Sequence, residues 1–151
     1  MNSHSILVIN GPNANLFGLR EATIYGATDL VEINQQIETL ARELDASIVE
    51  YFQSNHEGDI VDRIQKCLGS GVSGILINPT AYGHTSIAIR DALKAVELPF
   101  VEVHISNTFA REPFRHKTFL SDIASGVVIG FGANSYLLGL RGLVDRLRAA
   151  T

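Results

Sequence analysis

The stretch "DLVEINQQIETLARELDASIVEYF", residues 29–52, changes its hydrophobic spacing part-way along. Its first part carries apolar residues at intervals of three and four: Leu30, Ile33, Ile37, Leu40 and Leu44. This spacing predicts a helix with one buried face, and Asp29, followed three residues later by Glu32, predicts its N-terminal cap. Residues 47–52 are rich in β-branched and aromatic side chains, which predicts a strand. The stretch therefore predicts a helix that leads directly into a strand.

The same alternation continues on both sides of this stretch. Short apolar runs predict four more strands, at residues 6–9, 74–77, 100–105 and 126–131. Helical spacing predicts three more helices: one that opens at Ser54, with Glu57 at the capping-box position, and reaches Leu68; one from Ile87 to Val96; and one from Leu137 to Leu147. Five strands alternating with four helices predict an α/β fold with a doubly wound parallel sheet. Since right-handed crossovers leave few topologies, we expect a flavodoxin-like strand order.

The composition predicts a single globular domain over residues 1–151. The chain is 46% hydrophobic and 19% charged, which is ordinary for a globular protein, and its one cysteine, Cys67, cannot form an internal disulfide. No apolar run is long enough to span a bilayer, and residues 1–10 lack the basic region and cleavage site of a secretory signal. We therefore expect a cytoplasmic protein that neither enters a membrane nor, at a net charge of −4, binds nucleic acid.

Polar residues that follow the strands are the first indication of a site. Ligands of open parallel sheets bind beyond the carboxyl ends of the strands. There the sequence has residues 10–13, "NGPN", together with Gln53, Asn78 and His104. Residues 16–27 separate the first strand from the first helix and are too long for a tight turn, so we expect them to form a mobile active-site lid.

The run "VEVHIS", residues 101–106, points to proton transfer. Residues two apart in a strand share a face, so Glu102 and His104 are expected to lie side by side. A carboxylate beside an imidazole raises the imidazole pKa and fixes its tautomer, which suits a proton donor. The alternative is a structural histidine satisfied by hydrogen bonds, but the position of His104 at the end of its strand favours a functional role.

The run "NTFAREPFRHKTF", residues 107–119, gathers cations in a chain that is acidic as a whole. The cations are Arg111, Arg115, His116 and Lys117, against the single carboxylate of Glu112. Because the run follows the fourth strand, it hangs over the ligand-binding edge, where arginines favour an anionic small molecule. The alternative is a solvated basic face without a ligand.

Two further segments supply weaker candidates. In the lid, the guanidinium of Arg20 would stabilise the phenolate of Tyr25 and make it a usable base, although an exposed loop tyrosine more often packs against its neighbours. In "NPTAYGHTS", which follows the third strand, His84 could donate to a substrate oxygen, whereas Thr85 or Ser86 is more simply a helix cap. The sequence has no GxGxxG, GxxxxGK[ST] or GxSxG pattern, and its histidines lack zinc-ligand spacing.

Several motifs, in a compatible order, resemble the type II 3-dehydroquinate dehydratases: "ILVINGPNANLFGLREATIYG", "QSNHEG", "INPTAYGHTS", "IRDAL", "VEVHISN" and "AREPFRH". The likeness runs from about residue 6 to residue 132, and only the last helix lacks a diagnostic motif. It implies a flavodoxin-like fold and an anti elimination of water from 3-dehydroquinate, giving 3-dehydroshikimate through an enolate, without a metal or other cofactor. This reaction serves either aromatic biosynthesis or quinate breakdown.

The resemblance also implies roles for the proton-transfer residues. Tyr25 would remove the C2 proton, and Arg20 would keep its phenol ionised. Asn13 would help to stabilise the enolate through a water molecule. His104, oriented by Glu102, would donate a proton to the departing hydroxyl.

Other residues are implied in substrate binding and assembly. The groups that would bind the carboxylate and ring hydroxyls are Asn78, His84, the backbone amides of Ile105 and Ser106, and Arg115. Arg111 would support the basic environment of the site. Asp91 would reach the site of a neighbouring subunit, because the family assembles as trimers grouped into a dodecamer.

Departures from the family pattern occur at Ala14, Ala22, Thr80 and Gly83 and in the run "NTFA", residues 107–110. None of them is a proton-transfer residue, but Ala22 could loosen the lid, and Thr80 and Gly83 could alter the shape of the site. Two rival functions suit the same scaffold: a non-catalytic protein that keeps the anion site, and a flavin-binding protein. The first is disfavoured because a pure binder needs no acid and base pair.

Overall fold

The computed structural model describes residues 3–19 and 22–150. Its five strands form one all-parallel sheet: β1 (His4–Asn10), β2 (Ala46–Gln53), β3 (Gly74–Asn78), β4 (Phe100–His104) and β5 (Gly126–Ile129). The strand order is β2-β1-β3-β4-β5. This order confirms the predicted flavodoxin-like sheet, in which every predicted strand is present.

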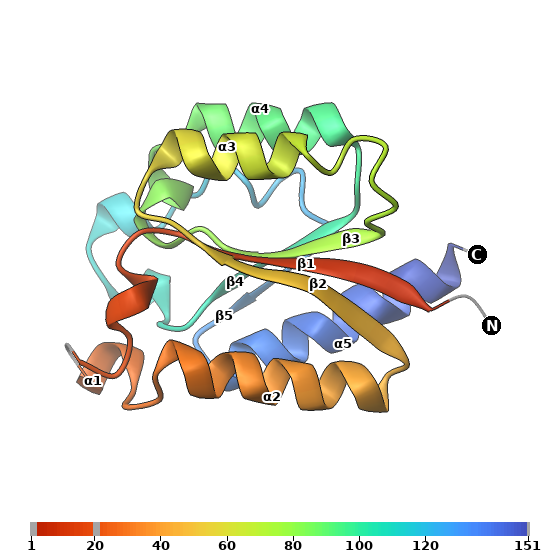
Figure 1. Cartoon of the computed structure of the whole chain (residues 1–151). Coiled ribbons are helices and arrows are strands. Elements are labelled where there is room, and N and C mark those ends of the chain that lie inside the picture. Colours follow the sequence, from red (N-terminus) through yellow and green to blue (C-terminus); the bar gives the residue numbers. More distant parts are fainter. Residues whose placement is uncertain (1–2, 20–21, 151) are drawn as a thin grey trace.

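Four long helices cover the two faces of the sheet (Figure 1). Helices α2 (Leu30–Glu43) and α5 (Asn134–Ala149) pack on one face, and α3 (Glu57–Gln65) and α4 (Ile87–Val96) on the other. Shorter elements gather where the strands end, at the left of Figure 1: α1 (Ala22–Tyr25) and the 3₁₀ turns η1 (Ala14–Leu16), η2 (Thr80–His84), η3 (Thr108–Ala110) and η4 (Pro113–Arg115). The doubly wound arrangement was predicted; α1 and the 3₁₀ turns were not.

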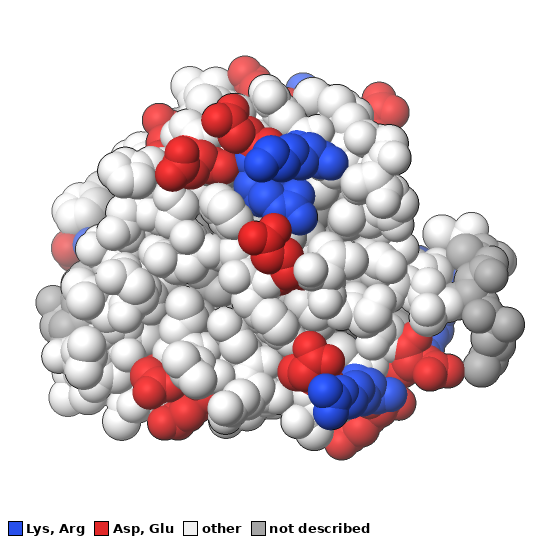
Figure 2. All heavy atoms as spheres, viewed as in Figure 1, with Lys and Arg blue, Asp and Glu red and all other residues white. Residues whose placement is uncertain are grey.

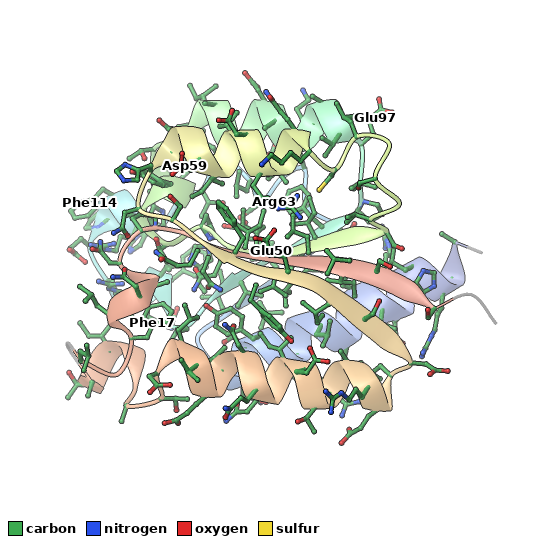
Figure 3. The ribbon with its side chains drawn as sticks, viewed as in Figure 1. Phe17, Glu50, Asp59, Arg63, Glu97 and Phe114 are labelled. Carbon is green, nitrogen blue, oxygen red and sulfur yellow. The ribbon has the colours of Figure 1, made fainter. Side chains whose placement is uncertain are left out.

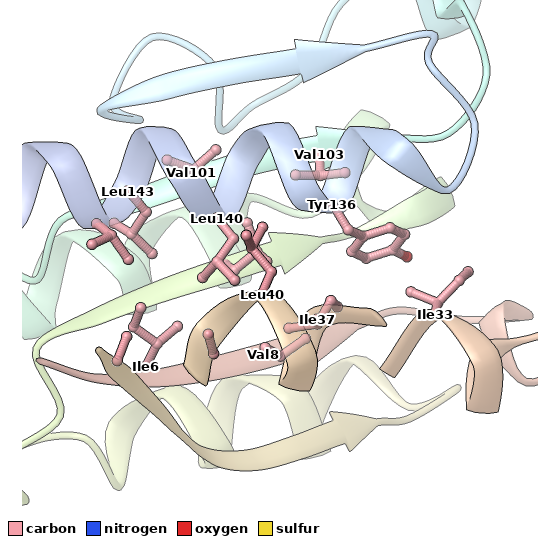
Figure 4. Packing of buried hydrophobic residues seen from close by; sticks show 14 of the residues in the cluster. Ile6, Val8, Ile33, Ile37, Leu40, Val101, Val103, Tyr136, Leu140 and Leu143 are labelled. Carbon is pink, nitrogen blue, oxygen red and sulfur yellow. The ribbon is translucent and has the colours of Figure 1, made fainter. Parts of the chain in front are cut away.

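Each face of the sheet has its own hydrophobic core. Along β1, Ile6 and Val8 belong to the cluster under α2 and α5, which Figure 4 shows from close by. Leu7 and Ile9 belong to the cluster under α3 and α4, and all four side chains are fully buried. A strand covered on both faces can be apolar at every position, which is why the central strands read as continuous hydrophobic runs. The two cores make the sheet a firm base for the loops at its carboxyl edge.

Two of the predicted N-terminal caps are present. The side chain of Asp29 accepts a hydrogen bond from the backbone N–H of Glu32 at 2.8 Å, at the start of α2. The hydroxyl of Ser86 accepts from the backbone N–H of Ile89 at 2.9 Å, at the start of α4. Each cap satisfies an amide that the first turn of a helix leaves without an intrahelical partner. Ser86 is therefore a helix cap rather than a site residue.

The predicted cap at Ser54 is wrong, because α3 begins at Glu57 with His56 as its N-cap residue. The hydroxyl of Ser54 accepts from the backbone N–H of His56 at 2.9 Å and donates to the carboxylate of Asp59 at 3.2 Å. These bonds make a turn before the helix. A hydroxyl near a helix start can close such a turn or cap the helix, and the sequence pattern does not distinguish the two.

The surface carries both signs of charge. Arg63 of α3 and Glu50 of β2 form an ion pair at 2.6 Å that ties the helix to the edge of the sheet (Figure 3). On the face shown in Figure 2, acidic and basic side chains are interspersed rather than gathered by sign. Among the described residues, no helix combines the length and the hydropathy that crossing a bilayer requires.

Candidate active site

A cavity of about 100 Å³ opens at the carboxyl edge of the sheet. It is lined by residues at or after the ends of three strands: Pro12, Asn13 and Phe17 after β1; Asn78, Thr80, Ala81 and His84 at and after β3; and His104, Ile105, Ser106, Thr108, Arg111 and Arg115 at and after β4. Figure 3 labels Phe17 and Phe114 at this end of the molecule. The strand ends therefore bring together segments that are far apart in the sequence.

Gly11 allows the first two of these segments to touch. Its backbone N–H donates to the carbonyl oxygen of Asn78 at 2.9 Å, which extends the β1–β3 pairing into the loops. A Cβ atom on Gly11 would lie 2.2 Å from the carbonyl oxygen of Pro79, much closer than any side chain tolerates. Only glycine permits this approach. The contact holds the segment of Asn13 against the segment that carries Asn78.

Glu102 and His104 form a buried pair at the end of β4, as their spacing predicted. Nε2 of His104 lies 2.6 Å from Oε2 of Glu102, and both residues are buried. Since a carboxylate only accepts, Nε2 carries the proton of this bond, and Nδ1 is the second ring nitrogen of a residue that lines the cavity. Burial opposes the charged form of Glu102, but hydrogen bonds, that of His104 first, hold the pKa of its carboxyl below the ordinary 4.5.

His84 faces His104 across the cavity wall. The two rings are stacked, with their centroids 5.8 Å apart. Nδ1 of His84 lies 2.8 Å from the carbonyl oxygen of Lys117, so Nδ1 is the donor and Nε2 has no proton in the neutral ring. Burial lowers the pKa of His84 below its ordinary value, although the bond to Lys117 opposes this effect. His84 is thus a fixed imidazole in the wall of the cavity.

The basic run divides into two groups. Arg111 and Arg115 are half-buried and line the cavity; Arg111 donates to the hydroxyl of Ser106 at 3.2 Å, and Arg115 donates to the Glu112 carboxylate at 3.0 Å. His116 and Lys117 are exposed and do not line this cavity. The run is therefore not a uniform solvated face, because two of its cations face a concave site.

A buried tyrosine that the sequence did not indicate holds the floor of the site. The hydroxyl of Tyr136, from α5, donates to Oδ1 of Asn10 and accepts from Nδ2 of Asn78 at 2.8 Å. Oδ1 of Asn78 accepts the backbone N–H of Thr80 at 3.1 Å. Tyr136 is fully buried (Figure 4), and its spacing in α5 indicates only a core position. These bonds fix which way the amide of Asn78 points.

The outcome for the predicted residues is uneven. The cavity collects Asn13, Asn78, His84, His104, Ile105, Ser106, Arg111 and Arg115, with Glu102 directly behind His104. Asp91 lies apart from them, exposed on α4. Arg20 and the side chain of Tyr25 lie outside the described residues, so the predicted lid base and its partner stay predictions. The predicted lid contains the end of η1 and all of α1, with Phe17 buried between them.

The described residues include no cluster of three or more His, Cys, Asp or Glu side chains that could hold a metal ion. The described polar groups that line the cavity are two imidazoles, two guanidinium groups, amides and the hydroxyls of Thr80, Ser106 and Thr108. An imidazole backed by a carboxylate suits proton donation, and guanidinium groups suit an anionic substrate.

Comparison with known proteins assigns the chain to a family. The dehydroquinase class II family matches residues 4–144. The chain belongs to this family. It is 57% identical over 143 residues to a 3-dehydroquinate dehydratase of Prochlorococcus marinus, covering 95% of this chain and 97% of that protein. It is 55% identical over 151 residues to a 3-dehydroquinate dehydratase of Acaryochloris marina, covering 100% of both.

A solved structure of the class II dehydroquinase family agrees with the fold. The crystal structure of type II dehydroquinase from Butyrivibrio crossotus superposes with a TM-score of 0.89 at 41% identity, covering 97% of this chain and 98% of that one. The family resemblance drawn from the motifs is thereby confirmed, and so is the flavodoxin-like architecture it implied.

Proposed function

We propose that this class II dehydroquinase eliminates water from 3-dehydroquinate to give 3-dehydroshikimate. The family makes it a hydro-lyase. The observation that carries the proposal is a concave site in which an imidazole held by a buried carboxylate faces two guanidinium groups. Such a site combines a proton donor with recognition of an anion, and the substrate offers a departing hydroxyl and a carboxylate.

His104 is the general acid of this scheme. Its bond to Glu102 leaves Nδ1 as the ring nitrogen that can donate toward the departing C1 hydroxyl. The carboxylate keeps the ring in one tautomer and one orientation, which lowers the cost of reaching the transition state. The burial of both side chains supports this role, because their interaction is stronger away from water.

The substrate carboxylate and ring hydroxyls bind along the opposite side of the cavity. Arg115 is the cation for the carboxylate, and Arg111 adds positive charge beside it. Further polar groups come from Asn78, His84 and the backbone amides of Ile105 and Ser106. Their common lining of one cavity supports a binding role for each of them.

Tyr25 is the proposed base that removes the C2 proton, with Arg20 favouring its phenolate. The resemblance to the family supplies these two roles. Asn13, exposed at the mouth of the cavity with a left-handed backbone, would stabilise the enolate through a water. An enolate requires a site that stabilises developing negative charge, which an amide and a basic environment provide.

The proposed assembly is a dodecamer of four trimers. Asp91 lies on the exposed side of α4, away from the cavity of its own chain. This position suits a residue that reaches the site of a neighbouring subunit. Light scattering of the purified protein would measure the assembly, and a monomer would contradict it. The cytoplasmic location and the choice between biosynthesis and quinate breakdown stay predictions.

The decisive test follows the absorbance of the enone product after 3-dehydroquinate is added to the purified protein. We expect wild type to form the enone, and Tyr25→Phe to lose kcat by about 10²–10⁴-fold with substrate binding largely kept, since a base acts in the transition state. Tyr51→Phe is the matched control, because Tyr51 lies on β2 and donates to Glu38. Near-normal kcat in Tyr25→Phe would remove Tyr25 from the mechanism. Tight binding without enone would instead indicate the non-catalytic alternative.

A further inference from the structure

Two hydroxyls lie behind the carboxylate of Glu102, on the side away from His104. The Ser121 hydroxyl is 2.6 Å from Oε1 of Glu102, and the Thr118 hydroxyl is 3.2 Å from the same oxygen. The two hydroxyl oxygens are themselves 2.5 Å apart. The other carboxylate oxygen, Oε2, is the one that receives the proton of His104. Each oxygen of this buried carboxylate therefore has its own donors.

The backbone anchors one end of these bonds. The Thr118 hydroxyl oxygen accepts the backbone N–H of Ser121 at 3.1 Å, which anchors the turn that carries both hydroxyls. The two hydroxyls have one proton each, and they make three contacts: with each other, and each with Oε1 of Glu102. If Thr118 donates its proton to the oxygen of Ser121, then Ser121 donates its own proton to Glu102. A chain of donors then runs from the backbone of the turn through both hydroxyls to Glu102. Bonds in such a chain strengthen one another.

We propose that Thr118 and Ser121 are positioning residues of the dehydration reaction, whose hydroxyls hold Glu102 as a charged carboxylate aimed at His104. This inference rests on the proposed function. Neither side chain lines the catalytic cavity, so neither touches the substrate. Both act through Glu102, which is fully buried between β3 and β5 and has Ile77 and Val127 as its strand neighbours.

Without the hydroxyls, Oε1 of Glu102 would be a buried charged oxygen with no donor. A buried carboxylate in that state takes up a proton more readily or turns toward another partner. A protonated Glu102 no longer presents a carboxylate to the N–H of His104, and a turned one no longer orients the ring. Removing the hydroxyls should therefore slow the proton-transfer step, and the loss of activity should grow as the pH is lowered.

Other charged groups near the pair remain the same in the variants considered below. On the cavity side they are His84 from η2 and Arg115 from η4. On the far side they are Arg90 from α4, Asp122, His116 and Lys117, around a groove that Thr118 and Ser121 also line. Arg90 is already bonded to Asp122 and to the carbonyl of Phe119. A change in pH dependence would thus arise from the missing hydroxyls.

The test measures kcat and KM for 3-dehydroquinate between about pH 5 and 9 in Ser121→Ala, Thr118→Val and the double variant, with unfolding curves as a check. Thr118→Ser restores the hydroxyl and serves as the rescue. Ser125→Ala is the matched control, since Ser125 lies in the same segment and, in the described part of the chain, its hydroxyl has no hydrogen-bond partner. If Ser121→Ala does not fold, Ser121→Cys, a weak donor of similar size, replaces it.

We expect kcat at pH 7 to fall about 10-fold in Ser121→Ala and about 100-fold in the double variant, with KM changed by less than about 3-fold. The ratio of variant to wild-type kcat should fall further toward pH 5. Thr118→Ser and Ser125→Ala should follow the wild-type profile. A loss that is the same at every pH, or no loss, would overturn the positioning role while wild type remains active. Absence of enone formation by wild type would overturn the proposed function itself.

Discussion

Several polar side chains in the cavity wall are held by another residue. Glu102 holds His104, the carbonyl of Lys117 holds His84, and the hydroxyl of Ser106 accepts from Arg111. Groups held in this way need little reorganisation when a substrate binds, so more of the binding free energy can act on the reacting atoms. At the scale of single residues, these pairs fix the positions of the functional groups in the cavity wall.

Arg115 should be the cation that matters most for substrate binding. Arg115→Ala should lower kcat/KM by roughly one and a half to three decades, because a charge-assisted contact in a closed site is lost at a cost on the order of 2–4 kcal/mol. Arg115→Lys should recover only part of the lost kcat/KM, since an ammonium cannot present two parallel donors. Lys117→Ala is the matched control, because that ammonium is exposed and lies over the Phe119 ring. Steady-state kinetics that give the same values for Arg115→Ala and Lys117→Ala would place the anion site elsewhere.

The hydroxyl of Tyr136 should itself contribute to stability, beyond the packing of the ring. Tyr136→Phe keeps the ring in the core but leaves Oδ1 of Asn10 and Nδ2 of Asn78 without this partner. We expect the free energy of unfolding in urea to fall by about 1–3 kcal/mol, the usual cost of unsatisfied buried polar groups.

The control for this prediction is Tyr51→Phe, which removes a hydroxyl bonded to Glu38 in a half-buried position. There water can replace the lost partner, so the change should be smaller, about 0.5–1.5 kcal/mol. Equal losses in the two variants would show that the buried network adds nothing beyond an ordinary hydrogen bond.

At the scale of elements, the turn after β3 carries local strain. Thr80 has φ of 50°, in the left-handed region that β-branched residues rarely adopt. Its hydroxyl donates to the carbonyl of Pro12 at 2.8 Å, and its N–H donates to Asn78. Two hydrogen bonds thus hold the residue in an unfavourable backbone conformation. Strain of this kind is common beside functional sites, where it fixes the direction of the chain.

Substitutions at Thr80 should therefore reverse the usual order of alanine and glycine. Both Thr80→Ala and Thr80→Gly lose the bond to Pro12, but only glycine also releases the backbone strain. We expect Thr80→Gly to be more stable than Thr80→Ala by about 1 kcal/mol in chemical unfolding.

Thr39 supplies the matched comparison, because it is exposed in the interior of α2 and its hydroxyl also donates to a backbone carbonyl, that of Gln35. The Thr39→Ala variant should be more stable to unfolding than the Thr39→Gly variant by about 1 kcal/mol. The same order at both positions would mean that Thr80 is not strained.

At the scale of the whole molecule, stability should fall as the solution becomes acidic. The pKa of His84 is lowered by burial from 6.5, and the pKa of Glu102 is lowered from 4.5 by its hydrogen bonds despite burial. In both cases the unfolded chain binds more protons than the folded one, so the free energy of unfolding rises with pH through each window. The pKa values of the Glu112 and Asp122 carboxyls are also lowered. Both carboxylates are exposed and screened by salt, so their contribution to stability is small.

Melting temperatures across a pH series check this expectation. Stability should begin to fall below about pH 6.5, where unfolded histidine gains a proton that His84 resists. It should fall more steeply below about pH 4.5, where unfolded glutamate gains a proton that folded Glu102 resists. His84→Gln should remove the first part of the fall and leave the second. A melting temperature that rises between pH 7 and pH 5 would contradict the assigned directions.

Prediction from the sequence succeeded where a feature depends on near neighbours. The pairing of Glu102 with His104 follows from the two-residue period of a strand, and the cap at Asp29 from a spacing of three. The helix start at Ser54 failed although it is local, since the same hydroxyl can close a turn. Tyr136 gave no sign of its role, because its partner Asn10 lies 126 residues away.

The sequence by itself determined the alternation of strands and helices, the two buried faces and the pairing of Glu102 with His104 at the end of β4. These features repeat with the periods of the backbone, so the spacing of apolar and polar residues is enough to specify them. Only the tertiary structure decided that Thr118 and Ser121 face Glu102, that Tyr136 holds Asn78, and which cations of the basic run enter the cavity. Those contacts depend on how the crossovers return each loop to the carboxyl edge and on how the side chains then pack. The local spacing of residues in the sequence does not specify such long-range contacts.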